Sequence, residues 1–209
     1  MARMRIGIYG GTFDPIHFGH LLLAESAREA LRLNRVLFVP ARIPPHKQEK
    51  HLTSEKDRVA MLRLALRGNR AFSVETFELE QNQVSFTVHT VEFLHEKYPH
   101  AELFLLMGED MLRIFPNWFQ PGRICELATP AVIGRAGHEI GSLEFLSNVA
   151  PPEKLEQIRA ARVPMPSVSF SSTAIREAVL AGQSIRYQTP ASVVRYVKAR
   201  QLYLQKEEN

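Results

Sequence analysis

Cysteine, long apolar runs and clustered charge are all scarce in this sequence of 209 residues. Its single cysteine, Cys125, excludes an intrachain disulfide and a cysteine-rich zinc site, and it suits a reducing compartment. No apolar stretch approaches the ~20 residues that a helix needs to span a bilayer. The first residues lead directly into a strand pattern, so we expect no targeting segment. We therefore expect a cytoplasmic protein with no membrane partner.

The charged residues are interspersed and nearly balanced, with 26 lysines and arginines against 22 acidic residues. Because no dense basic block is present, the formal net charge of +4 does not indicate a nucleic-acid partner. This small excess suits a mildly basic site for anionic nucleotides. With 45% hydrophobic and 23% charged residues, the chain has enough apolar side chains to bury a core.

Short apolar runs that are typical of buried strands alternate with segments of helical periodicity. The expected strands cover residues 4–9, 36–39, 72–74, 103–107 and 131–133, and the expected helices cover residues 21–31, 54–66 and 87–97. This alternation predicts an α/β fold with a Rossmann-like, doubly wound parallel sheet. In such sheets, ligands bind beyond the carboxyl ends of the strands.

The C-terminal third changes character, because prolines interrupt it at positions 151, 152, 164 and 166. Two helical patterns follow at residues 172–181 and 191–199, with Gly182 ending the first and Pro190 starting the second. We expect one domain over residues 1–209, with an α/β sheet core (1–166) and a C-terminal helical extension (167–209). Residues 136–166 carry no motif that predicts a role.

The segment from Gly10 to His20 contains the strongest indication of chemistry in the chain. It lies between an expected strand and an expected helix, where backbone amides can hold phosphate. Gly10 and Gly11 allow positive φ and a close backbone approach. His17 and His20 are three residues apart at the helix start, so both imidazoles can face one pocket and contact a polyphosphate. A simple tight turn and a metal site are the competing interpretations.

A second segment that suits phosphate follows the second expected strand. Pro44 and Pro45 stiffen this loop, which can hold His46 and Lys47 over a site. The lysine ammonium is a suitable point charge for phosphate oxygens. Taken alone, however, such a segment is more commonly a rigid surface loop with a solvated lysine.

A third segment lies far along the chain, at residues 170–176. Ser171, Ser172 and Thr173 open a helix, so their hydroxyls and the unpaired backbone amides point to one place. Arg176 follows Ser172 by four residues and can reach the same end of the helix. The competing interpretation is a serine-rich helix cap with a solvated arginine.

Two regions carry groups that suit a nucleoside. Asp110 follows the expected strand at 103–107, where a carboxylate can accept hydrogen bonds from ribose hydroxyls. Trp118 and Phe119 can enclose a pyridine ring, although a sole tryptophan is more commonly part of a core. Thr87 begins an expected helix and can cap it or present its amide to a carboxylate.

Together these segments resemble the signatures of bacterial nicotinate-mononucleotide adenylyltransferases. The resemblance covers residues 10–20, 44–47, 108–118 and 171–176 and extends to positions near both ends of the chain. Its His-x-Gly-His element also occurs in pantetheine-phosphate adenylyltransferases and, more loosely, in class I aminoacyl-tRNA synthetases. Phe86 and His89 depart from the family pattern, which usually has a tyrosine and an acidic residue at these positions.

The resemblance implies transfer of an adenylyl group from ATP to nicotinate mononucleotide, with release of pyrophosphate, in NAD biosynthesis. The implied catalytic residues are His17, His20, Lys47 and Arg176. These four and the following residues are expected to bind ATP: Gly10, Gly11, Thr12, Phe13, Asp110, Ser171, Ser172 and Thr173. The residues expected at the mononucleotide are Thr12, Phe13, His46, Ser85, Thr87, Trp118 and Phe119.

Mg²⁺ is expected to enter with ATP, and Asp14 can either orient the turn or lie near the metal. The same chemistry on nicotinamide mononucleotide or phosphopantetheine stays open, as do a nucleotide-binding module without turnover and a homo-oligomer. A dinucleotide-binding oxidoreductase is disfavoured, because the turn after the first strand lacks Gly-x-Gly-x-x-Gly and the second strand ends in Val39 and Pro40. The chain is too short for a tRNA synthetase with an anticodon-binding domain.

Overall fold

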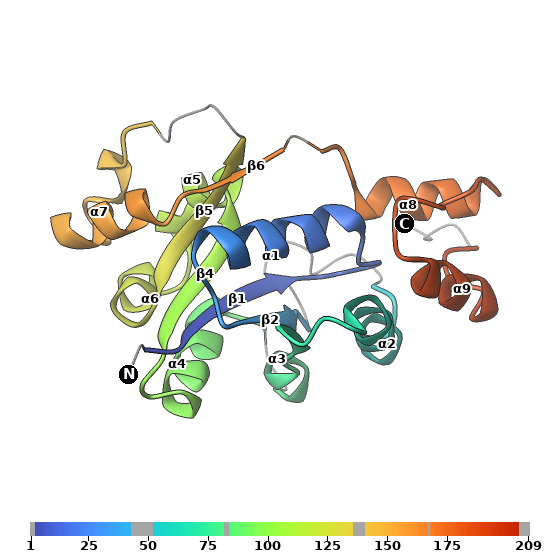
Figure 1. Ribbon diagram of the computed structural model, residues 1–209, viewed down its shortest axis with the longest axis horizontal. Coiled ribbons are helices and arrows are strands. Elements are labelled where there is room, and N and C mark those ends of the chain that lie inside the picture. The colour runs from blue at the N-terminus through green and yellow to red at the C-terminus, as the bar shows by residue number, and fades with distance from the viewer. Residues whose placement is uncertain (1–2, 43–51, 82–83, 136–140, 167, 205–209) are drawn as a thin grey trace.

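The central element of the protein is a six-stranded, all-parallel sheet with the strand order β3-β2-β1-β4-β5-β6 (Figure 1). The computed structural model describes residues 3–42, 52–81, 84–135, 141–166 and 168–204. The strands are β1 (Arg5–Gly11), β2 (Arg35–Pro40), β3 (Phe72–Val74), β4 (Glu102–Gly108), β5 (Thr129–Arg135) and β6 (Val163–Met165). The predicted Rossmann-like α/β fold is therefore confirmed.

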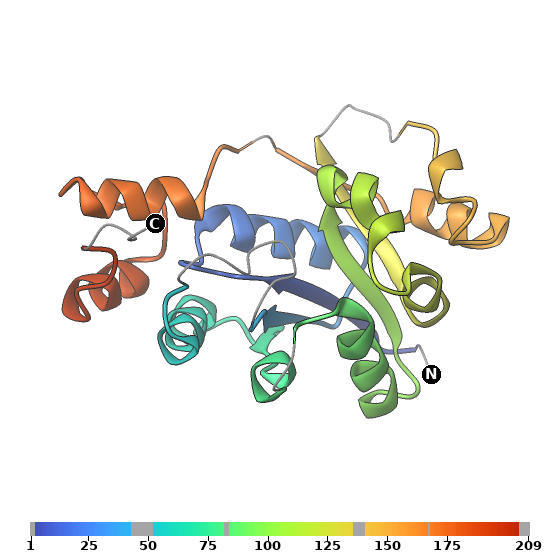
Figure 2. The ribbon, with the colours of Figure 1, turned by 180° about the vertical axis from the view of Figure 1, so that it is seen from behind.

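Helices cover both faces of this sheet (Figures 1 and 2). The α-helices are α1 (Phe18–Ala30), α2 (Glu55–Leu66), α3 (Phe77–Glu80), α4 (Thr87–Lys97), α5 (Glu109–Ile114), α6 (Pro121–Leu127), α7 (Pro152–Ala160), α8 (Ser172–Leu180) and α9 (Ala191–Ala199). Two short 3₁₀ helices, η1 (Phe115–Asn117) and η2 (Glu144–Leu146), complete the described elements. All the helices expected from the sequence are present.

Two hydrophobic clusters lie on the two faces of the sheet, because neighbouring strand residues point to opposite sides. Tyr9 in β1 belongs to the cluster that also contains side chains of α1, α2, α8 and α9. Ile8, its neighbour, belongs to the cluster with side chains of α4, α6 and α7. Burial on both faces explains why the central strands are continuous apolar runs in the sequence.

The predicted helix ends are also confirmed. Ser54 caps α2, since its hydroxyl accepts the Asp57 amide at 3.1 Å. Gly182 follows α8 with a φ of +69°, and Pro190 caps α9. By contrast, β6 and α7 lie within the proline-interrupted stretch, for which we named no strand or helix from the sequence. Apolar periodicity does not predict β6, because this strand has only three residues and one of them is proline.

The strand order places a candidate site at the carboxyl ends of β1 and β4. The chain moves outward in one direction from β1 to β2 and β3, and in the other from β4 to β5 and β6. Such a reversal opens a crevice between the two loops that follow the central strands. The helices α8 and α9 approach the same end of β1, beside α2 (Figure 1). In the described parts of the chain, helices are too short or too polar to cross a membrane.

Candidate functional site

The turn after β1 does not use the positive φ that its two glycines allow. Gly10 and Gly11 both lie in β1 and are paired with β2. The left-handed residue is Phe13, with a φ of 51°. Gly11 is required for another reason, because a Cβ atom there would lie 2.9 Å from the Phe13 ring. That ring is buried and helps to anchor the turn in the core.

His17 and His20 form a reciprocal cap at the N-terminus of α1. The His20 amide donates to Nδ1 of His17 at 3.3 Å, and the His17 amide donates to Nδ1 of His20 at 3.2 Å. The two rings are stacked, with centroids 3.6 Å apart and planes inclined by 15°. Because each Nδ1 accepts a hydrogen bond, a neutral ring carries its proton on Nε2. Both imidazoles are therefore set as Nε2–H donors at a helix N-terminus, which suits an anion.

The charge of this pair is restricted by its surroundings. Burial lowers the pKa of His17 to about 4, so its imidazole is neutral near pH 7 in the ligand-free protein. A second reason is the stacking, since two positive rings at this separation would repel each other. His17 is thus a neutral donor in the ligand-free protein.

The structure brings the C-terminal motif to the loop that precedes these histidines. Ser171 caps α8, and the Ser172 hydroxyl donates to the Pro15 carbonyl at 2.9 Å. Arg176 donates to the Asp14 carbonyl at 2.8 Å. The predicted meeting of the two motifs is thus present, although Ser172 and Arg176 also hold the loop in place. The ring of Phe170 lies 6.1 Å from that of His17.

Asp14 is buried in the loop, with 2% of its surface exposed. One carboxylate oxygen accepts the Thr53 amide at 3.0 Å, and the other accepts the Tyr203 hydroxyl at 2.6 Å. These contacts favour the orienting role over the metal role that the sequence left open. Within the described ranges, no three histidine, cysteine or acidic side chains come together in a way that could hold a metal ion.

Arg58 is fully buried, and we did not predict it as a site residue from the sequence. Its guanidinium donates to the carbonyls of Thr12, Ala41 and Thr53 at 3.0, 2.8 and 3.1 Å. Burial lowers the pKa of Arg58, and the nearby Asp14 carboxylate acts in the opposite direction. A sequence signal existed, since Arg58 precedes the buried Met61 by one helical turn. Arg58 therefore ties the ends of β1 and β2 to the start of α2.

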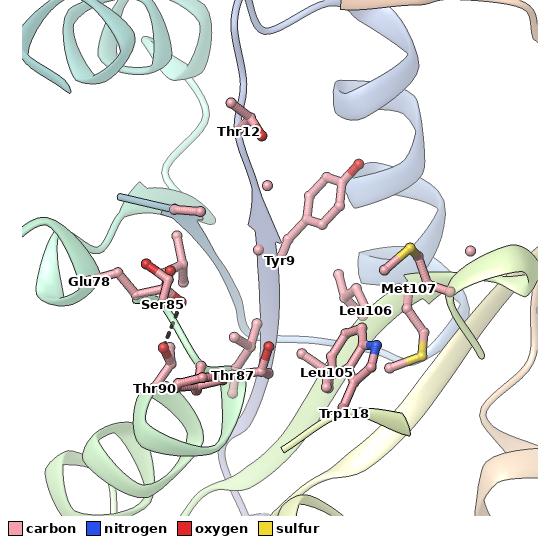
Figure 3. A pocket seen from close by; sticks show the side chains of 18 of the residues that line it. Tyr9, Thr12, Glu78, Ser85, Thr87, Thr90, Leu105, Leu106, Met107 and Trp118 are labelled. Atoms are coloured by element: carbon pink, nitrogen blue, oxygen red, sulfur yellow. Dashed lines mark hydrogen bonds between the residues drawn. The ribbon is translucent and has the colours of Figure 1, made fainter. Parts of the chain in front are cut away.

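A cavity of about 440 Å³ lies between the ends of β1 and β4 and the start of α4 (Figure 3). Its wall is mainly apolar, with side chains such as Ile8, Leu105 and Met107. Gly10, Gly11 and Thr12 also line it, which connects it to the loop that leads to the histidines. A mainly apolar cavity of this size with a few polar groups suits a small organic ring.

The polar side of this cavity comes from the start of α4 and from Glu78 (Figure 3). The Thr90 hydroxyl donates to Glu78 at 2.6 Å, and the Ser85 side chain also hydrogen-bonds this carboxylate. Burial raises the pKa of Glu78, an effect that these hydroxyls oppose. Ser85 and Thr87 line the cavity, and Thr87 is the first residue of α4. Glu78 lies in a short helix that carried no motif.

Aromatic side chains line the cavity on the side of η1. Trp118 packs edge-on against Phe115, with centroids 5.4 Å apart, and its buried Nε1 has no hydrogen-bond partner among the described residues. Phe119 is 47% exposed, and its ring lies 4.9 Å from Phe86 and 6.1 Å from His89. The two residues that depart from the family pattern thus surround Phe119.

The remaining predicted residues add little to the geometry of the site. Asp110 lies in the first turn of α5 and is exposed, at the carboxyl end of β4. Thr173 lies at the start of α8, where its hydroxyl is 3.5 Å from the Arg176 guanidinium. His46 and Lys47 lie outside the described residues.

Comparisons with known proteins find relatives over nearly the whole chain. Residues 8–178 match the family model described as cytidylyltransferase-like. The chain is 42% identical to a probable nicotinate-nucleotide adenylyltransferase of Thermomicrobium roseum, over 95% of this chain and 91% of the relative. A protein of the same name from a Roseiflexus species is also 42% identical, over 97% of this chain and 100% of the relative.

Solved structures share the fold at lower identity. Nicotinic acid mononucleotide adenylyltransferase of Plasmodium falciparum, complexed with NaAD, matches with a TM-score of 0.75 at 18% identity, over 98% of this chain and 100% of the other. A putative nicotinate-nucleotide adenylyltransferase from Vibrio parahaemolyticus matches with a TM-score of 0.70 at 19% identity, over 98% of both chains. With these matches over nearly its whole length, the chain belongs to the nicotinate-nucleotide adenylyltransferase family of cytidylyltransferase-like proteins.

Proposed function

We propose that the protein transfers the adenylyl group of ATP to nicotinate mononucleotide, giving nicotinate adenine dinucleotide and pyrophosphate in NAD biosynthesis in the cytoplasm. The observation that carries this proposal is the stacked His17–His20 pair at the start of α1, with both Nε2–H groups set as donors. The pair adjoins a loop that also lines the apolar cavity. An anion site and a ring site are thus connected by one short segment.

In this reaction, a phosphate oxygen of the mononucleotide attacks the α-phosphorus of ATP. The new P–O bond forms as the bond between the α-phosphorus and the oxygen bridging to the β-phosphate breaks. No side chain needs to act as nucleophile, because the attacking oxygen belongs to the substrate. Catalysis therefore rests on positioning and on donors that stabilise the charge of the leaving pyrophosphate.

The donors for this charge come from three segments. We assign His17 and His20 to the phosphates of ATP, together with Lys47. The α8 start contributes Ser171, Ser172 and Thr173, and Arg176 reaches the same region, where it already contacts the loop. The backbone at residues 10–13 includes the end of β1 and the start of the turn, and residues 10–12 line the cavity, so its amides can contact both substrates. Asp110 is assigned to ribose.

Mg²⁺ does not fit a site made by the described side chains. Both oxygens of Asp14 already accept hydrogen bonds from the protein, and no other acidic or histidine cluster suits a metal within the part of the chain that is described. We propose that Mg²⁺ enters on the phosphates of ATP, which usually hold it together with water.

The acceptor ring is assigned to the cavity beside α4. A nicotinate carboxylate suits the start of a helix, where the Thr87 amide belongs to the unpaired first turn. Trp118 and Phe119 supply aromatic surface for the pyridine ring, and Ser85 and His46 complete the assignment. An amide acceptor would bring N–H groups against N–H donors, which leaves polar groups unpaired and lowers its use.

The experiment that tests this function is pyrophosphate release by the purified protein with ATP and Mg²⁺. Nicotinate mononucleotide, nicotinamide mononucleotide and phosphopantetheine are offered separately. We expect a strong preference for the nicotinate compound. Preference for another acceptor would overturn the assignment of the ring site, and ATP binding without release by any acceptor would favour a nucleotide-binding module.

Replacement of His20 tests the role of the imidazole pair. In His20→Ala, we expect kcat to fall by at least ~10²-fold, because one preorganised donor to the transition-state charge is lost. His20→Asn, which retains a polar group near the helix start, serves as the control for stability and is expected to lose the same activity. Near-normal kcat in either folded variant would remove His20 from catalysis.

The low pKa of His17 predicts a dependence of stability on pH. Between about pH 4 and 6.5, the unfolded chain binds a proton at residue 17 that the folded protein does not bind, so the unfolding free energy falls as the pH is lowered. At about pH 5, this single group accounts for a loss of at most about 2 kcal/mol. Urea unfolding at pH 5 and pH 7.5 measures it in the wild type and in His17→Asn, whose side chain can still cap α1. An equal pH effect in both proteins would contradict a neutral, buried His17.

Replacement of Trp118 tests the ring site. In Trp118→Ala, we expect KM for nicotinate mononucleotide to rise by roughly fivefold or more, with a smaller change in KM for ATP, because aromatic stacking is lost. Trp118→Phe retains an aromatic ring and should show a smaller effect. Equal changes in the two KM values of the alanine variant would instead indicate a packing role against Phe115.

A further inference from the structure

The loop that leads into α1, defined as residues 14–17 together with the first helical residue Phe18, makes many of its contacts with the C-terminal end of the chain. Residues 14–18 make five hydrogen bonds to residues between 172 and 203. Four involve the loop backbone: Asp14 O with Arg176, Pro15 O with Ser172, Ile16 O with Thr189, and the Phe18 amide with the Gln188 carbonyl. The fifth joins the Tyr203 hydroxyl to the Asp14 carboxylate at 2.6 Å.

The Tyr203 contact differs from the other four because it is made to a side chain of the loop, whereas the others are made to the loop backbone. Asp14 is 2% exposed, so water cannot readily replace the hydroxyl that one of its oxygens accepts. The other oxygen accepts the Thr53 amide, which fixes the orientation of the carboxylate. Burial raises the pKa of the Tyr203 phenol, and the adjacent Asp14 carboxylate raises it further, so the phenol remains a donor.

We propose that Tyr203 is a positioning residue for adenylyl transfer, acting through Asp14 on the loop that places His17 and His20. The inference rests on the proposed function, since it assumes that the histidine pair faces the transferred phosphate. His17 caps α1 only three residues after Asp14, so a shift of the loop moves the imidazole pair. A misplacement of about 1 Å in a preorganised site can lower a rate by about 10²-fold.

The chain contains its own control for this contact. The Tyr196 hydroxyl donates to the Asp57 carboxylate at 2.7 Å. Like the Tyr203–Asp14 contact, it is a hydrogen bond from a phenol of the C-terminal extension to a carboxylate of the sheet core. Asp57, however, lies in α2 and is also held by Ser54 and Arg200. It makes none of the five contacts to the loop. Loss of the Tyr196 hydroxyl thus weakens C-terminal docking without a direct effect on the histidines.

The test compares Tyr203→Phe with Tyr196→Phe in the full-length protein, at a temperature well below the Tm of both. We expect both substitutions to lower Tm. Tyr203→Phe should also lower kcat by at least tenfold, with KM for nicotinate mononucleotide within about twofold of the wild type. Tyr196→Phe should keep kcat within about twofold. Equal kcat values in the two variants would overturn the positioning role and leave Tyr203 as a docking contact only.

A second readout does not depend on turnover. In ligand-free protein, NMR signals of the imidazole nitrogens of His17 and His20 should shift in Tyr203→Phe and stay in place in Tyr196→Phe. Unchanged signals in both variants would overturn the inference. If the wild type releases no pyrophosphate with any acceptor, the proposed function fails, whereas full activity of Tyr203→Phe in an active enzyme overturns only the role of Tyr203.

Discussion

The buried guanidinium of Arg58 is the contact on which the geometry of the site depends. A cation removed from water costs several kcal/mol, unless hydrogen bonds and opposite charge offset the loss. Here the carbonyls of Thr12, Ala41 and Thr53 accept its hydrogen bonds, and Asp14 lies close enough to influence its pKa. These carbonyls belong to the ends of β1 and β2 and to the residues just before α2. The three segments must therefore meet at one point, which fixes where the loop toward α1 begins.

Beyond the Arg58 contacts, residues of the C-terminal extension hydrogen-bond the loop that leads to α1. The stacked histidines lie at the end of this loop. The separation of 3.6 Å between the rings of His17 and His20 disfavours two positive charges. A ring that carries its proton on Nε2 and accepts an amide hydrogen bond at Nδ1 can donate to an anion without becoming charged. Burial lowers the pKa of His17 and so preserves the hydrogen bond that its Nδ1 accepts. The capping contacts and the Nε2–H donors therefore occur together in one turn of helix.

Local patterns in the sequence predicted the strands and helices well, because apolar periodicity and caps such as Ser54 act within a few residues. Resemblance to a family, which carries information about distant contacts, implied that the motif around Ser172 and the motif around His17 bind the same phosphate chain. Two features could not be predicted, for physical reasons. Gly11 allows both positive φ and a close approach, and only the structure shows that it makes room for the Phe13 ring. The contact between Tyr203 and Asp14 spans 189 positions and has no local signature.

The polar wall of the cavity beside α4 contains a buried carboxylate, Glu78, and two hydroxyls that hydrogen-bond it. As an anion, Glu78 accepts hydrogen bonds from the hydroxyls of Thr90 and Ser85, so the protons of both hydroxyls are already committed. A hydroxyl has one proton, and each of these groups then presents only lone pairs to a ligand. Donors for a carboxylate would have to come from elsewhere, and the first turn of α4, which begins at Thr87, has backbone amides without a partner in the helix. Such donors do not depend on side-chain identity, so the departures from the family pattern at Phe86 and His89 would leave them in place.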